Sequence, residues 1–160
     1  MTATPGKAAL VAALRAQLED ALATARTAHQ AAVEGATHAE ARPENDKDTR
    51  GLEQSYLARG IAQRVAELEA AVAAVAGWRP RAFGDAEPIA LGAVVAVDDD
   101  GRTRRFLIAG HGGGLALPGD VTVLTPSSPI ARALLGRRVD DDCEVSLGGS
   151  PRTLTVTAVD

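Results

Sequence analysis

The chain has 160 residues and a formal net charge of −4; 46% of its residues are hydrophobic, but only 2% are aromatic. It contains no basic block, which excludes nucleic-acid binding through a broad electrostatic footprint, and no apolar run of the roughly 18 to 20 residues that a membrane span needs. Cys143 is the single cysteine and cannot form an internal disulfide, so we expect a protein of the reducing cytoplasm with no membrane contact.

Two long segments carry the residue spacing of paired helices. Small and apolar residues recur at steps of three and four over residues 11–32, which makes a heptad seam. A second seam covers residues 52–75, and we expect Leu52 to lie in the core between the helices. Gly60 interrupts this seam, and close approach of the partner helix would be one reason for a glycine there. The pattern predicts an antiparallel coiled-coil hairpin over residues 1–77.

The segment between the two seams is the expected tip of the hairpin, near residues 37–50. Helical periodicity stops there, and Pro43 is unfavourable inside a helix. Glu44, Asp46 and Asp48 stand at alternate positions. Carboxylates spaced in this way can converge on a hard cation, and magnesium accepts one or two of them while keeping several waters. A solvated acidic loop is the other interpretation of the same residues.

The second half of the chain has a different pattern. A linker is expected over residues 78–87, and an α+β body follows over residues 88–160, with a small and mostly antiparallel sheet. The expected strands are 93–97, 104–109, 115–117, 121–124, 143–147 and 153–159. One short helix is predicted between Ser128, its expected N-cap, and Gly136, with Pro129 in the first turn.

Other chemical motifs in the body have simple structural interpretations. The glycines at 112–114 lack the Gly-Lys-Ser/Thr ending of a phosphate loop, which favours a plain flexible loop. His29, His38 and His111 do not have the spacing of a zinc site. Cys143 is expected to be a small core or edge residue. We therefore expect no catalytic residue, metal site or cofactor belonging to this chain itself.

The stretch Ser-Pro-Ile-Ala-Arg-Ala-Leu-Leu-Gly at 128–136 strongly resembles the signature of the C-terminal domain of the Gre factors, GreA and GreB. Residues 91–97, 108–110 and 142–145 fall where that domain carries similar segments. The resemblance covers residues 88–160 and implies an FKBP-like fold for them. The predicted hairpin resembles the N-terminal coiled coil of the Gre factors in architecture.

The resemblance implies a role at bacterial RNA polymerase. Ser127, Ser128 and Pro129 match the loop by which Gre factors dock on the rim of the polymerase secondary channel. Their hairpin reaches through the channel, where tip carboxylates help to hold a second magnesium ion and a water. They thereby stimulate cleavage of backtracked RNA, in indirect contact with the nascent RNA 3′ end. The implied protein is a monomer that assists the polymerase and is not an independent enzyme.

The tip differs from the usual Gre order, in which Gly-Asp and two further residues precede Glu-Asn and a tyrosine. Glu44-Asn45 matches the Glu-Asn, but Ala41 stands where the family has the aspartate, and Tyr56 lies further on. Stimulation of cleavage and non-cleaving regulation or inhibition at the secondary channel therefore both remain as hypotheses.

Two further hypotheses assign the protein to other functional classes. A coiled-coil adaptor unrelated to polymerase would be a parallel dimer through its helices. A prolyl isomerase would need an aromatic-lined apolar pocket, for which the body offers Trp78, Phe83 and Phe106.

Overall fold

A computed structural model describes residues 3–40 and 50–160 of the chain. The chain divides into two compact units, one formed by Met1–Leu14 together with Trp78–Asp160 and the other by Arg15–Gly77. We call the first unit the body and the second the arm. The heptad pattern assigns the first 14 residues to the hairpin, whereas in the structure they group with the body. The predicted linker at residues 78–87 stays a prediction.

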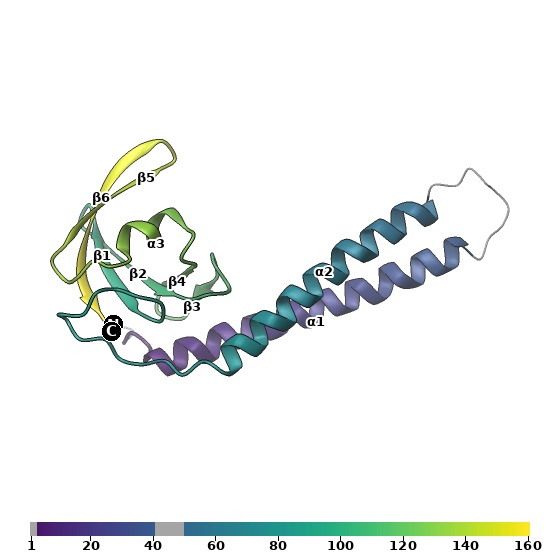
Figure 1. Ribbon diagram of the computed structural model, residues 1–160, viewed down its shortest axis with the longest axis horizontal. Helices are drawn as coiled ribbons and strands as arrows, with labels where there is room; N and C mark the ends of the chain where they lie inside the picture. Colours follow the sequence, from purple (N-terminus) through teal and green to yellow (C-terminus); the bar gives the residue numbers. More distant parts are fainter. Residues whose placement is uncertain (1–2, 41–49) are drawn as a thin grey trace. The chain divides into compact units, whose positions relative to one another are not determined.

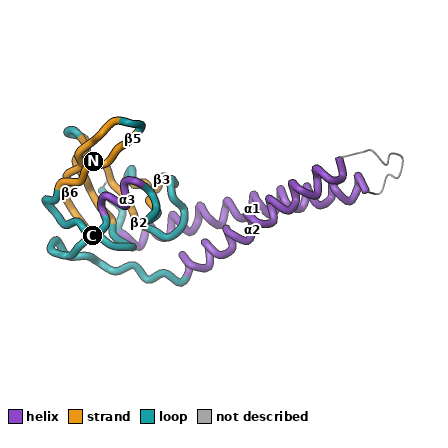
Figure 2. The backbone as a smooth tube through the Cα atoms, turned by 45° about the horizontal axis from the view of Figure 1, so that its top comes forward, coloured by secondary structure: helices purple, strands orange, loops and turns teal. Residues whose placement is uncertain are grey.

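The arm consists of the helix α2 (Arg50–Ala76) and of the helix α1 (Lys7–Glu40) from Arg15 onward. The two helices lie side by side in Figures 1 and 2. Arg26 Nη2 lies 2.9 Å from Glu69 Oε1. Further along, a Cβ built on Gly35 would lie 2.8 Å from Gln54 Oε1. Residue numbers rise along one helix as they fall along its neighbour, so the predicted antiparallel pairing is confirmed.

The expected end of the first helix and the expected core of the arm both need correction. α1 continues through Gly35 to Glu40, so the first residues of the predicted tip are helical. Leu52, predicted to be buried, is 55% exposed. The pairing of Gly35 with Gln54 places Leu52 opposite a part of α1 rich in alanine and glycine, which offers a large side chain little apolar surface. The buried residues of the arm are Leu18, Leu22, Ala32, Leu68, Ala71 and Val75.

Gly60 offers a test of helix propensity in the arm. It is exposed, and nothing lies within 4 Å of a Cβ built on it, so close approach of the partner helix does not explain it. We expect Gly60→Ala to raise the free energy of unfolding of the arm by about 0.5 to 1 kcal/mol, because alanine loses less backbone entropy in a helix. Urea denaturation followed by far-ultraviolet circular dichroism measures the change.

The matched control for this substitution is Gly35→Ala. It gains the same propensity but must displace the side chain of Gln54, so a smaller gain is expected. A lower stability for Gly60→Ala than for the wild type would contradict this explanation.

The body contains a six-stranded sheet with the strand order β3-β4-β2-β1-β6-β5, and a short helix, α3 (Pro129–Leu134). The strands are β1 (Val94–Asp99), β2 (Arg102–Ile108), β3 (Ala116–Leu117), β4 (Val121–Leu124), β5 (Asp142–Leu147) and β6 (Ser150–Val159). The predicted α+β class is confirmed. One strand pairing, β2 with β4, is parallel, whereas the other pairings of this sheet are antiparallel.

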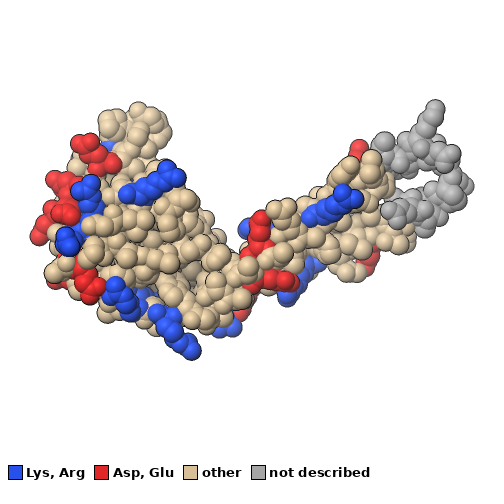
Figure 3. Space-filling model, in the orientation of Figure 1, with Lys and Arg blue, Asp and Glu red and all other residues tan. Residues whose placement is uncertain are grey.

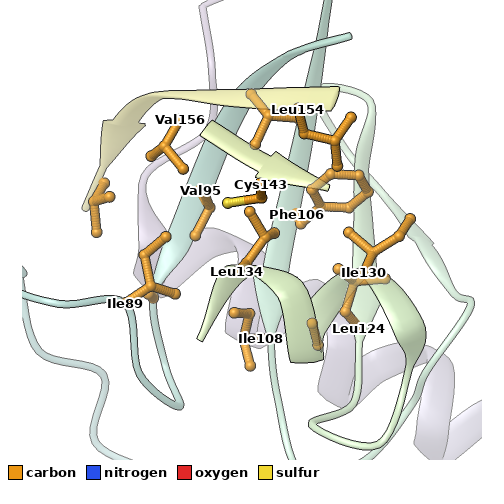
Figure 4. Packing of buried hydrophobic residues seen from close by; sticks show 14 of the residues in the cluster. Ile89, Val95, Phe106, Ile108, Leu124, Ile130, Leu134, Cys143, Leu154 and Val156 are labelled. Carbon is orange, nitrogen blue, oxygen red and sulfur yellow. The ribbon is translucent and has the colours of Figure 1, made fainter. Parts of the chain in front are cut away.

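The core of the body lies between α3 and one face of the sheet. In Figure 4, Ile130 and Leu134 of α3 lie opposite Phe106, Cys143 and Leu154 of the strands. Cys143 is 1% exposed, as predicted for a small core residue, and burial raises the pKa of its thiol. Phe106 is 1% exposed, so it fills the core and does not line a pocket for a prolyl substrate.

The first two turns of α1 pack on the body through its glycine loop. A Cβ built on Gly112 would lie 2.6 Å from Leu14 Cδ1, and one on Gly119 would lie 2.5 Å from Pro5 Cδ. Leu14 is fully buried. Of the glycines at 112–114, interpreted from sequence as a plain flexible loop, Gly112 therefore allows the backbone to approach Leu14 of α1 closely.

Lys7 fixes the start of α1 to two other parts of the body. Its ammonium donates hydrogen bonds to the carbonyl oxygens of Arg81 and Asp160, and it lies 4.8 Å from the centre of the Phe83 ring. Burial lowers the pKa of Lys7. The contacts join the beginning of α1, the segment after α2 and the end of β6.

Candidate functional site

The predicted docking residues lie where β4 leads into α3. Ser128 has the extended backbone of an N-cap, its hydroxyl oxygen accepts a hydrogen bond from the Ala131 N–H at 3.2 Å, and Pro129 is the first residue of the helix. The cap predicted from sequence is confirmed. Its physical basis is local, because a serine oxygen satisfies one of the free N–H groups at a helix start, and proline there has no N–H to leave unsatisfied.

The loop before α3 is closed by its own hydrogen bonds. The Ser128 N–H donates to the Thr125 carbonyl oxygen at 3.0 Å, and the hydroxyls of Thr125 and Ser127 lie 3.3 Å apart. Ser127 and Pro129 are exposed, whereas Ile130, the next residue of α3, is buried. The arrangement presents small polar and apolar groups on a fixed element, which suits protein contact. We call Ser127, Ser128 and Pro129 the docking loop.

A second polar feature lies at the end of β1. Asp99 is a buried carboxylate, 6% exposed, whose Oδ2 lies 3.3 Å from Arg104 Nη1 and 2.9 Å from Arg152 Nη1. A surface hollow of about 640 Å³ is lined by these three residues together with Asp100, Arg102 and Thr103. The sequence Asp98-Asp-Asp-Gly101 has the composition of a hairpin turn, and this composition alone predicts no functional role for Asp99. The signal that could have identified it is the alternation Val95, Val97, Asp99, which predicts an inward-facing carboxylate.

The predicted tip carboxylates Glu44, Asp46 and Asp48 lie outside the described residues, so their role stays a prediction. Over residues 3–40 and 50–160, no group of three or more His, Cys, Asp or Glu side chains is arranged to hold a metal ion. Among the described helices, none is both long and apolar enough to cross a membrane.

The arm has exposed apolar side chains on α2, close in sequence to the tip. Tyr56 is 60% exposed, and the Arg59 guanidinium carbon lies 5.4 Å from the centre of its ring. On the face shown in Figure 3, basic and acidic side chains of each unit are interleaved without a continuous basic area. This distribution agrees with the sequence-based exclusion of a broad nucleic-acid footprint.

Comparison with known proteins gives matches that include the docking loop. Residues 85–160 match the family model described as transcription elongation factor, GreA/GreB, C-terminal. The transcription elongation factor GreA of Sphingopyxis alaskensis is 34% identical over 73 residues, which cover 45% of this chain and 44% of that protein. The match thus spans less than half of that relative's length.

Two solved structures also match this chain, both at low sequence identity and with TM-scores below 0.5. GreA factor homolog 1 of Thermus thermophilus is 24% identical, with 91% of this chain and 94% of that chain covered and a TM-score of 0.40. A GreA/GreB elongation factor from Nitrosomonas europaea is 17% identical, with 57% and 78% covered and a TM-score of 0.34.

Proposed function

We propose that the chain is an elongation factor of the Gre family that binds bacterial RNA polymerase in the cytoplasm, because residues 85–160 match the C-terminal domain of that family. The observation that carries the proposal is the family match over residues 85–160, which includes the whole sheet and α3. The protein would act as a monomer bound to the polymerase and would not be a catalyst by itself.

The docking loop is the part of the body that we assign to polymerase contact, at the rim of the secondary channel. Its exposed Ser127 and Pro129 are held by the Ser128 cap and by burial of the adjacent Ile130. A pre-organised loop loses little conformational entropy when it binds. This geometry supports a role as a rigid contact surface.

The arm is the part that we assign to the active site of the polymerase. Its α2 has 27 residues and is therefore about 40 Å long at 1.5 Å per residue. The acidic segment that contains Glu44, Asp46 and Asp48 joins the two helices. We propose that these carboxylates share a magnesium ion with the polymerase next to the RNA 3′ end. Magnesium there would stabilise developing charge and activate a water for cleavage of backtracked RNA.

A second candidate function is regulation of the polymerase without RNA cleavage, by occupation of the secondary channel. The specific observation in its favour is Ala41, which stands where Gre factors usually have an aspartate. Loss of one carboxylate removes an oxygen ligand from a site that must hold a divalent ion. Both candidates share the polymerase as partner and differ in what the tip does there.

Transcript cleavage in artificially backtracked polymerase complexes separates the two candidates. We expect the wild type to accelerate cleavage, and Asp46→Asn/Asp48→Asn to reduce the rate to that of the polymerase alone, because the amides carry no charge for magnesium. Glu53→Gln, a charge-neutralising control on α2, should leave the acceleration unchanged.

Two other outcomes of the cleavage experiment would lead to different conclusions. Slower nucleotide addition without cleavage, relieved by an authentic Gre factor as competitor, would identify the non-cleaving regulator. Absence of both effects, with no polymerase binding, would refute the proposed function as a whole.

A further inference from the structure

The inner face of the sheet continues beyond the hydrophobic core and changes there from apolar to charged. Val97 of β1, Phe106 of β2 and Leu154 of β6 are 0%, 1% and 0% exposed. Because side chains of a strand alternate between faces, the residue two positions further along shares the inner face. Those next inward residues are Asp99, Arg104 and Arg152.

The three charged residues form a network in which Asp99 contacts one nitrogen of each arginine. Most N–H donors of the two guanidinium groups are not used by Asp99. Asp99 contributes one oxygen, Oδ2, to both arginines, whereas each guanidinium has five N–H donors. Asp99 is 6% exposed, but the side chains of Arg104 and Arg152 are 38% and 53% exposed. The buried carboxylate therefore positions two guanidinium groups that remain accessible to a ligand.

The position of Arg104 is also restrained from its other side. Its guanidinium carbon lies 5.1 Å from the centre of the Phe106 ring, and Phe106 is fixed in the core. Cation–π contact of this kind holds a guanidinium over an aromatic face and leaves its edge free for hydrogen bonds. A planar group with donors along one edge suits bidentate binding of an oxyanion.

The charge of the hollow selects the kind of anion. Its lining contains three arginines, at 102, 104 and 152, and two aspartates, at 99 and 100. The lining thus carries one excess positive charge, although the chain as a whole is at −4. A carboxylate balances that charge, whereas a phosphate dianion would exceed it.

The hollow adjoins a second one, which points to an extended ligand. A depression of about 320 Å³ is lined by Asp99, Asp100, Pro151, Arg152 and Thr153. It shares Asp99, Asp100 and Arg152 with the larger hollow, so both hollows lie at the end of β1. A chain of several residues can occupy such a surface, with one acidic side chain in the larger hollow.

We propose that this pocket, formed by Asp99, Arg104 and Arg152, binds an aspartate or glutamate side chain on a segment of a partner protein. The identification of that partner as RNA polymerase rests on the proposed function; the carboxylate specificity rests on the pocket alone. The pocket would provide a second contact in addition to the docking loop. Asp99 acts as a positioning residue, and the two arginines contact the ligand.

Binding of a short acidic peptide to the full chain tests the pocket directly. The probe is acetyl-Ala-Glu-Ala-Glu-Ala-amide, and its glutamine analogue is the control ligand. We expect saturable shifts of the Arg104 and Arg152 Nε–H signals in nuclear magnetic resonance spectra with the glutamate peptide only. Arg152→Gln should abolish them, whereas Arg105→Gln, on the opposite face of β2, should not. Inorganic phosphate should shift the same signals less than the peptide.

The same variants separate failure of the pocket from failure of the partner assignment. We expect Arg152→Gln to weaken binding to the polymerase by about threefold to tenfold, the range for a partly exposed ion pair, while Arg105→Gln has no effect. Absence of peptide shifts in a folded wild type, or stronger binding of phosphate, would overturn the carboxylate pocket. Peptide shifts with unchanged polymerase affinity of Arg152→Gln would overturn the polymerase as its partner and leave the pocket intact.

Discussion

Leu134→Ala is expected to lower the free energy of unfolding of the body by about 3 kcal/mol. Leu134 is fully buried and belongs to α3, which has only six residues. A helix of that length is not stable by itself in water, so its position depends on the side chains that it buries. Removing most of the fully buried Leu134 side chain also weakens the support of the docking loop that precedes the helix.

Trp78 provides the measurement for this substitution. It is the only tryptophan of the chain, and its Cζ2 would lie 3.3 Å from a Cβ built on Gly92, so its fluorescence reports on the body during urea denaturation. Arg132→Ala, an exposed change on the same helix, is the control and should change the stability by less than about 0.5 kcal/mol. Equal effects of the two substitutions would contradict the assignment of Leu134 to the core.

Gly112→Ala is expected to destabilise the body by about 2 to 4 kcal/mol, as the sum of two separate terms. Gly112 has a φ of 83° in the left-handed region, where a Cβ is strained. In addition, its Cβ would lie 2.6 Å from Leu14 Cδ1, so the buried Leu14 side chain would have to shift. The same urea denaturation experiment measures the sum.

Gly114→Ala isolates the backbone term of this prediction. Gly114 also has a positive φ, of 86°, but nothing lies within 4 Å of a Cβ built on it, so only the strain of about 1 to 2 kcal/mol applies. The double variant Leu14→Ala/Gly112→Ala should cost less than the two single substitutions together, because the smaller side chain removes the clash. Equal costs at 112 and 114, with additive double-variant behaviour, would show that α1 does not pack on this loop.

The features predicted correctly from sequence are those with a local physical cause. Ser128, Pro129 and Gly136 enclose α3 because capping and proline chemistry act within one helical turn. The strands follow from period-two alternation, and the turn at Asp100-Gly101 has a positive φ at both residues, as a tight hairpin requires.

The features that escaped prediction depend on contacts between segments far apart in the chain. Periodicity marks Leu52 as apolar at a seam position, but it does not reveal that the facing part of α1 is rich in alanine and glycine and offers little apolar surface. An apolar stripe also looks the same whether it meets another helix or a loop of the body, so the grouping of Leu14 with the body could not be predicted. The network of Asp99 with Arg104 and Arg152 requires the register of three strands, which no single stretch of sequence contains.

Affinity for the core enzyme of bacterial RNA polymerase tests the central claim most directly. We would measure binding of the full chain to immobilised polymerase for the wild type, for Ser127→Arg in the docking loop, and for Thr157→Arg at an exposed position of β6. We predict saturable binding of the wild type, a loss of about tenfold or more for Ser127→Arg because a long charged side chain blocks a close contact, and no change for Thr157→Arg. Absence of wild-type binding, or equal affinities for all three proteins, would contradict the account.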